Sequence, residues 1–153
     1  SSAGEIQTQF LNNDSVAELT SGDVGTIGLS WYHYTFPKTD ANDWLAQQHQ
    51  AQYGEPPDLD AECGFATAQA IVAALEATGG DTSPAQLIPA LEGLQFDGPK
   101  GVYKIRPADH QVLAPLYIVQ LTSIDDPDQA YFELVEEVPG SDDQLPCTAP
   151  NCS

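Results

Sequence analysis

The chain has 153 residues, 41% of them hydrophobic, and carries 23 acidic against four basic side chains, for a formal net charge of −19. This length and composition suffice for one folded domain with its own core. A surface this acidic repels nucleic acid and anionic lipid, so neither is expected as a partner. The scarcity of lysine and arginine indicates either a salt-rich habitat or an acidic exterior.

Residues 1–24 are predicted to form an entry segment, in which Asn13-Asp14-Ser15 caps a short helical turn. The first strand candidate runs from Gly25 to Phe36. Residues of high β propensity, both β-branched and aromatic, are dense there, and Pro37 closes the run. This segment therefore supplies the only strand predicted in the first half of the chain.

Two helices are predicted next. The segment from Asp40 to Tyr53 begins at a cap supplied by Thr39 or Asp40 and ends where Gly54-Glu55-Pro56-Pro57 interrupts it. Residues 60–78 repeat apolar side chains at three- and four-residue spacing, and Gly79-Gly80 terminates that pattern. The second of these helices is the more strongly indicated.

A third, shorter helix follows. Ser83-Pro84-Ala85-Gln86 has the form of a capping box with proline at the first helical position. The helix is expected to stop at Gly93 and to kink at Pro89, which removes one backbone donor.

The last part of the chain is predicted to be strand-rich. Gly101 to Ile105 alternates as a half-buried strand, and Leu116 to Leu121 is a more continuous, better buried one. Residues 123–130 form an acidic loop, and Tyr131 to Val138 fits either a strand or a short helix. The order is that of an α/β protein. One early strand and a late pair do not obviously cover three amphipathic helices, so a partner segment is expected to be missing.

Three of the four basic residues, Lys100, Lys104 and Arg106, fall within one short segment. We expect a hairpin whose cations neutralise nearby carboxylates. A dedicated anion site is the alternative, although two or three exposed cations contribute little binding free energy.

The cysteines are Cys63, Cys147 and Cys152. The last two form a Cys-x4-Cys pattern in a proline-rich tail, which predicts a small disulfide loop and an extracytoplasmic location. Free thiols or a zinc site remain open alternatives, although zinc needs about four ligands and no histidine lies near the tail. Cys63 begins an apolar helix and is expected to be buried.

Catalysis is not indicated. His33, His49 and His110 lie in no recognisable arrangement with a nucleophile, and Gly-x-Ser-x-Gly is missing. His49 is expected at the surface and His110 in a turn, where it satisfies local hydrogen bonds. Asp125-Asp126-Pro127-Asp128 lacks the spacing of a calcium loop, so a solvated loop is expected. No phosphate-binding loop is present, and no cofactor or metal is predicted.

From Gly25 to Thr122 the chain carries, in order, a set of motifs that are each weak but together fairly specific. The motifs are Trp31-Tyr32-His33-Tyr34, Tyr53-Gly54, Gly64 to Ala70, Gly79-Gly80-Asp81, Ala90-Leu91-Glu92-Gly93, Phe96 to Gly101 and Asp109-His110-Gln111. In this order and spacing the chain resembles the type I solute-binding proteins of ABC transporters, the branched-chain amino-acid-binding class.

The resemblance implies a two-lobed α/β fold, joined by crossover strands, that closes on a small solute. The chain would be its C-terminal portion, contributing helices, a crossover strand and closing strands over 25–122. The upstream portion of the same protein, a small-molecule solute and a membrane permease are the implied partners. Residues 123–153 are expected to be an acidic, proline-rich extension that contains Cys147 and Cys152.

The resemblance also places candidate ligand contacts. Trp31, Tyr32, His33 and Tyr34 would lie near the interlobe cleft, and such rings bury much area while offering a hydrogen bond. Inward packing of alternate residues as core is the alternative. Glu62 would face the cleft and pair with a ligand ammonium, or else it simply complements the positive end of its helix.

The predicted function is therefore an extracytoplasmic, periplasmic or cell-surface solute-binding component of an ABC importer, not an enzyme. It would bind an amino acid or a similarly small polar or aromatic solute. A ligand-sensing domain of the same fold in a receptor or regulator is one alternative. A small acidic α/β enzyme with its own complete pocket is the other.

Overall fold

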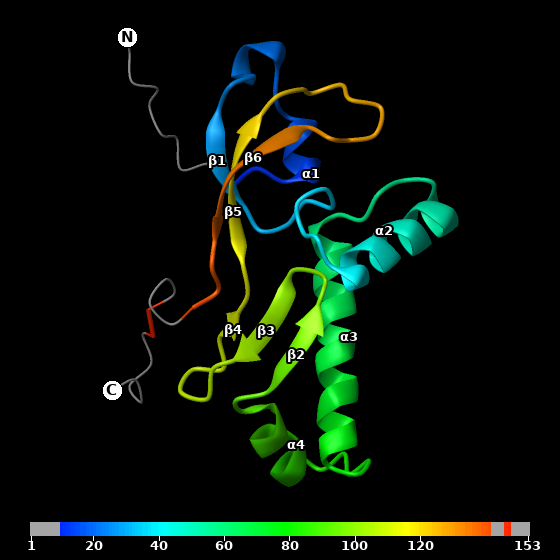
Figure 1. Ribbon diagram of the computed structural model, residues 1–153, viewed down its shortest axis with the longest axis vertical. Helices are drawn as coiled ribbons and strands as arrows, with labels where there is room; N and C mark the ends of the chain where they lie inside the picture. The colour runs from blue at the N-terminus through cyan, green and yellow to red at the C-terminus, as the bar shows by residue number, and fades with distance from the viewer. Residues whose placement is uncertain (1–9, 142–145, 148–153) are drawn as a thin grey trace.

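The computed structural model describes residues 10–141 and 146–147, and within them the chain builds two three-stranded antiparallel sheets. The molecule is elongated, with one sheet in its upper part and the other below it, above α4 (Figure 1). The upper sheet has the order β1-β5-β6 and the lower has the order β2-β3-β4. Their bounds are β1 Ile27–Ser30, β2 Gln95–Gly98, β3 Gly101–Ile105, β4 Val112–Leu113, β5 Leu116–Leu121 and β6 Phe132–Val138.

The upper sheet is built around β5, which pairs with β1 on one side and β6 on the other. Residues alternate between half-buried and buried along β5, so one face of the strand is fully covered. That face joins a core formed by Leu11, Val16, Phe36, Tyr117, Val119, Leu121 and Phe132. Only one member of the predicted late pair joins the early strand, because β1 pairs with β5 across the whole intervening sequence, whereas Gly101–Ile105 forms β3 of the lower sheet.

Segments assigned to the flanks also enter this sheet. Phe10 bridges Leu29 in parallel, and the amide of Leu11 donates to the Leu29 carbonyl at 2.9 Å. The helix α1, Asn13–Val16, forms slightly earlier than predicted, with the Ser15 hydroxyl bonded to the Asn12 carbonyl. The segment predicted as a C-terminal extension supplies β6, which resolves the ambiguity over 131–138 in favour of a strand.

The first strand is much shorter than the predicted span of 25–36, because the chain turns at its aromatic part. Ser30 Oγ donates to the Tyr32 carbonyl at 3.1 Å, and the Phe36 amide donates to the His33 carbonyl at 3.1 Å. These local bonds replace a sheet ladder after Ser30. The aromatic composition of 31–36 therefore reflects burial in loop packing, not strand pairing.

Two helices match their predictions closely. Helix α2 is Asp40–Tyr53, with Thr39 Oγ1 accepting from the Asn42 amide at 3.0 Å, and it ends at Gly54, whose φ of 81° is left-handed. Helix α3 is Leu59–Ala77, and Asp58 caps it by accepting from the Ala61 amide at 2.8 Å. The intervening prolines keep these helices separate.

Helix α4, Pro84–Leu91, also forms where predicted, with proline at its start and Pro89 inside it. The predicted capping box is wrong, since the Ser83 side chain makes no cap hydrogen bond. Instead the Ser83 amide donates to Asp81 Oδ1 at 2.8 Å. The first helical position is a proline with no amide to cap, which weakens the demand for a side-chain cap here.

The lower sheet is a hairpin that continues into a short third strand. Gly101 takes the left-handed φ of 97° at the turn between β2 and β3. Arg106 pairs with Asp109 at 2.6 Å, which confirms that cations of this segment neutralise nearby carboxylates. The turn at Asp109-His110-Gln111 brings in β4, which the sequence did not indicate.

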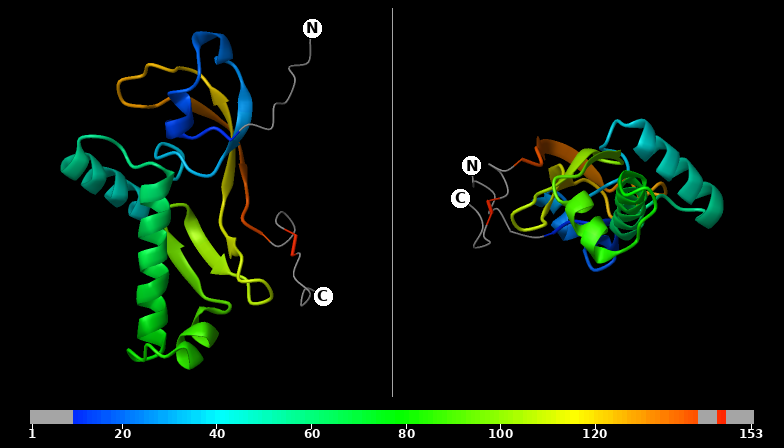
Figure 2. Two further views of the ribbon diagram at one scale, coloured as in Figure 1. Left: turned by 180° about the vertical axis from the view of Figure 1, so that it is seen from behind. Right: turned by 90° about the horizontal axis from the view of Figure 1, so that it is seen from below.

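We call the upper sheet with α1 the upper unit, and the lower sheet with α2, α3 and α4 the lower unit. Among the described residues, two crossings, 31–39 and Ala114-Pro115, connect the two units, and we call this region the junction (Figures 1 and 2). Gly140, after β6, packs on the second crossing so closely that a Cβ there would lie 2.3 Å from the Ala114 amide nitrogen. A side chain would collide with backbone, which cannot rotate away.

Gly140→Ala should destabilise the protein by at least about 2 kcal/mol, because the methyl group must displace the Ala114 backbone. Gly64→Ala is the matched control. A Cβ at Gly64, in helix α3, meets nothing within 4 Å, and alanine should stabilise the helix by about 0.5–1 kcal/mol. Urea denaturation of both variants measures these effects. Equal stability of Gly140→Ala and the parent chain would refute the proposed close packing.

Candidate functional site

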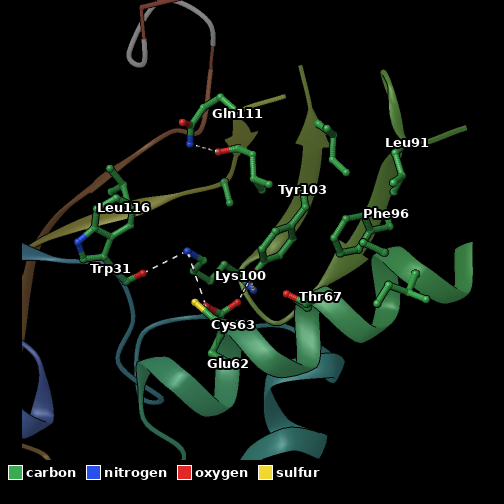
Figure 3. Close-up of a pocket in the computed structure, with 16 residues that line it drawn as sticks. Trp31, Glu62, Cys63, Thr67, Leu91, Phe96, Lys100, Tyr103, Gln111 and Leu116 are labelled. Carbon is green, nitrogen blue, oxygen red and sulfur yellow. Dashed lines mark hydrogen bonds and ion pairs between the residues drawn. The ribbon is translucent and has the colours of Figure 1, made fainter. Parts of the chain in front are cut away.

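An apolar groove of about 410 Å³ runs between α3 and the lower sheet and reaches the junction (Figure 3). Trp31 and Lys100 stand at its junction end, and Glu62 and Cys63 come from the start of α3. Its remaining walls are almost entirely apolar. They include Ala66, Ala70, Ile71, Leu91, Phe96, Val112, Ala114 and Leu116.

A buried carboxylate anchors the polar end of the groove. Glu62 is 1% exposed and accepts a very short hydrogen bond from the Tyr103 hydroxyl. Its other oxygen lies 3.9 Å from Lys100 Nζ. Because α3 begins at Leu59, Glu62 lies one turn into the helix and points across to the hairpin. Glu62 is thus neither solvated at the helix end nor unpaired.

Lys100 lies in the turn between β2 and β3 and is the cation of this cluster. Its side chain is 7% exposed, and Nζ donates to the Trp31 carbonyl at 3.2 Å. Nζ also lies 5.7 Å from the centre of the Tyr103 ring, within cation–π range. Burial lowers the pKa of Lys100, while the Glu62 carboxylate opposes that shift.

Tyr103 completes the cluster. Burial raises the pKa of its phenol, and the neighbouring Glu62 charge adds to the shift. The hydroxyl therefore keeps its proton for Glu62 and accepts from the Lys100 amide at 3.2 Å. Gly98 makes room for this ring, since a Cβ there would lie 2.7 Å from it. The cluster can hold one negative and one positive charge out of water beside an apolar cavity.

The structure brings two of the five predicted ligand contacts, Trp31 and Glu62, to this groove. Trp31 is 40% exposed and stacks on Phe10 with ring centres 6.0 Å apart. Tyr34 instead lines a separate hollow near Asp128, to whose carbonyl its hydroxyl donates at 2.6 Å. Tyr32 is buried and donates to Asn42 Oδ1 at 2.8 Å.

His33 is also in the interior, 1% exposed among aromatic rings. Its Nε2 lies 3.0 Å from the Gln129 carbonyl, which can only accept, so Nε2 carries the proton. Nδ1 then accepts from the Thr35 hydroxyl at 2.7 Å. Burial lowers the pKa of His33 to about 4, so the ring is neutral at pH 7. Ligand roles for Tyr32, His33 and Tyr34 remain predictions.

Sequence reasoning missed two members of the cluster, Lys100 and Tyr103, and misplaced a third residue, Cys63. The crowding of scarce cations around Lys100 was a usable signal, but nothing local indicated that one of them is buried. Cys63 is exposed, not buried as predicted, because the groove leaves its side of α3 uncovered. Its thiol still has a raised pKa, from partial burial and from Glu62.

The other predicted features behave as surface or structural groups. His110 is exposed and lies 3.1 Å from Glu92, and His49 is half-buried. Within 10–141 and 146–147, no three potential metal ligands gather. Cys147 is disulfide-bonded. Its predicted partner Cys152 lies outside the described residues, so that pairing stays a prediction.

The family comparison explains this architecture. A model of the periplasmic binding protein family matches residues 9–127, most of the chain. The chain belongs to the type I periplasmic binding proteins. A search of curated proteins finds no significant match.

Solved structures of periplasmic binding proteins agree with this assignment. An ABC-type branched-chain amino acid transporter protein from Rhodopseudomonas palustris CGA009 is 34% identical, with a TM-score of 0.67 over 76% of this chain and 31% of its own. An amino acid ABC transporter substrate-binding protein from Pseudomonas fluorescens Pf-5 is 25% identical, with a TM-score of 0.76 over 96% and 40%.

A third periplasmic binding protein, a Rhodopseudomonas palustris solute-binding protein in complex with benzoate, shares the fold at 21% identity. Its TM-score is 0.69, over 90% of this chain and 36% of its own. The chain thus spans only 31% to 40% of the length of these three relatives. Among the described helices, none combines the length and apolarity needed to cross a membrane.

The stability of this binding-protein chain should depend on His33 between pH 7 and pH 4. The unfolded chain protonates His33 near pH 6.5 and the folded chain near 4. Folding stability tied to His33 is therefore present above pH 6.5 and falls by up to about 3 kcal/mol as the pH drops towards 4.

His33→Gln should remove this slope, since glutamine can still donate to the Gln129 carbonyl without titrating. Urea denaturation gives the free energy of unfolding of the variant and the parent across the pH range. The difference between the two isolates the contribution of His33 from that of the many carboxylates. His110→Gln, at an exposed position, serves as the control. A difference between parent and His33→Gln that does not change with pH would contradict the assignment.

Proposed function

We propose that this chain is the C-terminal portion of the solute-binding component of an ABC importer, and that it acts outside the cytoplasm. The solute is an amino acid or a similarly small polar or aromatic molecule, captured by closure of two lobes and delivered to a membrane permease. The observation that carries the proposal is the groove at the junction, where Trp31 and a buried charge cluster meet in a member of this family.

The chemistry of the groove supports such a solute. A small-molecule site is concave and mostly apolar, with a few convergent polar groups that fix orientation. Here the apolar walls end at Glu62 and Trp31, which offer a charge and an aromatic face together. One relative is described as a branched-chain amino acid transporter and another is in complex with benzoate, and both kinds of molecule have an apolar body and a carboxylate.

The surface of α3 supports the presence of further polypeptide from the same protein. This helix has 19 residues, rich in alanine and aliphatic side chains, yet only Glu62, Ala66 and Ala74 are buried. Ile71 and Val72 are more than half exposed. A helix of such composition is normally covered on more than one face. We infer that the upstream portion of the protein packs on α3 and closes the open side of the groove.

Solute binding should require that longer polypeptide. Calorimetry with benzoate and with leucine is expected to show no tight binding to the 153-residue chain and tight binding of at least one solute to the chain extended upstream. In the extended chain, Trp31→Ala should weaken binding about tenfold, as loss of an aromatic anchor does. Trp44→Ala, outside the groove, is the control. Tight binding by the 153-residue chain alone would overturn the proposed incompleteness.

The alkylation rate of the Cys63 thiol tests, without any solute, whether upstream polypeptide covers α3. Cys63 lines the groove and is exposed in this chain, so iodoacetamide can reach it, although its raised pKa lowers the fraction of reactive thiolate. In the chain extended upstream, we expect alkylation to be at least about tenfold slower, because reaction then needs local opening. Mass spectrometry under non-reducing conditions measures the rate, with both denatured chains as the reference. Equal rates in the two folded chains would argue against a cover at this position.

A further inference from the structure

We propose that Lys100 is a positioning residue, which holds the two candidate ligand contacts Trp31 and Glu62 in register across the junction. The inference rests on the proposed function, because it concerns the same groove. It assigns Lys100 no contact with the solute. Its ammonium group instead ties a crossing of the chain to the start of α3.

The contacts of Lys100 reach three separate parts of the chain. Nζ donates to the Trp31 carbonyl at 3.2 Å, on the crossing that leaves the upper sheet. The same atom lies 3.9 Å from the Glu62 carboxylate on α3. The Lys100 amide donates to the Tyr103 hydroxyl, which in turn donates to Glu62. The network forms a closed ring from β3 to α3 and back, with Trp31 attached through the ammonium (Figure 3).

The backbone around Lys100 is fixed independently of its side chain. Thr39, the cap of α2, donates through Oγ1 to the Pro99 carbonyl at 2.7 Å. This bond links the hairpin turn to the far end of the same crossing that carries Trp31. The crossing is therefore held at both ends, at Trp31 by the Lys100 side chain and at Thr39 by the turn backbone. Loss of the ammonium would release the Trp31 end from the hairpin, while the stacking on Phe10 and the Ser30 bond to the Tyr32 carbonyl would remain.

The distribution of charge argues that this burial is specific. The chain has 23 acidic and four basic residues, so a lysine has many exposed carboxylates available as partners. Placing one of these few cations in a site where its side chain is 7% exposed costs desolvation free energy. Glu62, Tyr103 and Trp31 face the ammonium from three elements and compensate that cost. Such an arrangement fixes one geometry, which a mobile surface pair would not.

The test follows Trp31 directly, in a Trp44→Phe background that leaves it as the only tryptophan. Lys100→Met removes the ammonium but retains much of the apolar stem, and Lys100→Arg restores a cation. Lys38→Met removes an equal charge from an exposed lysine on the same crossing and is the matched control. Acrylamide quenching and the fluorescence anisotropy decay of Trp31 are measured without solute, and circular dichroism confirms folding.

Lys100→Met should raise the quenching constant of Trp31 about twofold and add a fast component to its anisotropy decay, because the local segment is released. Lys100→Arg should restore at least part of the parent behaviour, and Lys38→Met should match the parent. A folded Lys100→Met chain with unchanged Trp31 signals would overturn the proposal, as would an equal change in Lys38→Met.

A second variant keeps the test decisive if Lys100→Met does not fold because Glu62 is left buried without its cation. In Glu62→Gln/Lys100→Met both charges are gone, and folding should recover. Trp31 should remain mobile in this double variant, because its carbonyl still lacks a donor. Parent-like quenching and anisotropy would overturn the proposal. None of these measurements uses a solute, so their outcome does not depend on whether the proposed transport function is correct.

Discussion

The centre of this molecule is organised by one buried carboxylate, Glu62, which needs a cation and hydrogen-bond donors as partners. Glu62 is withdrawn from water on α3, and an ionised group in that position requires a compensating charge and hydrogen-bond donors. Tyr103 and Lys100 supply them from the hairpin. Their placement fixes the hairpin against α3, and through Lys100 it fixes the crossing at Trp31. The polar end of the groove and the contact between the hairpin and the first crossing depend on this arrangement.

Local sequence signals predicted the regular elements well. Helix α2 and strands β3 and β5 lie where composition and periodicity placed them, because caps, glycines and prolines act within a few residues. The strand predicted through 31–36 was too long. Aromatic residues favour strands and buried loops alike, and only the hydrogen bonds of Ser30 and His33 decide between them. The pairing of β1 with β5 is a long-range choice that no local pattern encodes.

The candidate site was harder to predict, for a related reason. Trp31 and Glu62 were found through their place in a family pattern, and the structure brings both to one groove. Lys100 and Tyr103 were not predicted, because the burial of Lys100 depends on a carboxylate 38 positions away, Glu62 on α3. Cys63 was misjudged because α3 has an open side in this chain. Each miss concerns a contact between elements, not the identity of an element.

The two crossings at the junction differ in what holds them. The first, at 31–39, is tied to the hairpin by hydrogen bonds, from the Lys100 ammonium to the Trp31 carbonyl and from the Thr39 hydroxyl to the Pro99 carbonyl. The second, at Ala114-Pro115, is flanked by buried apolar residues, and Gly140 packs closely against its backbone. Apolar contacts weaken on cooling, whereas buried polar contacts respond to extremes of pH and little to salt. Cooling would thus weaken the contacts at the second crossing, whereas an extreme of pH would act on the polar contacts at the first.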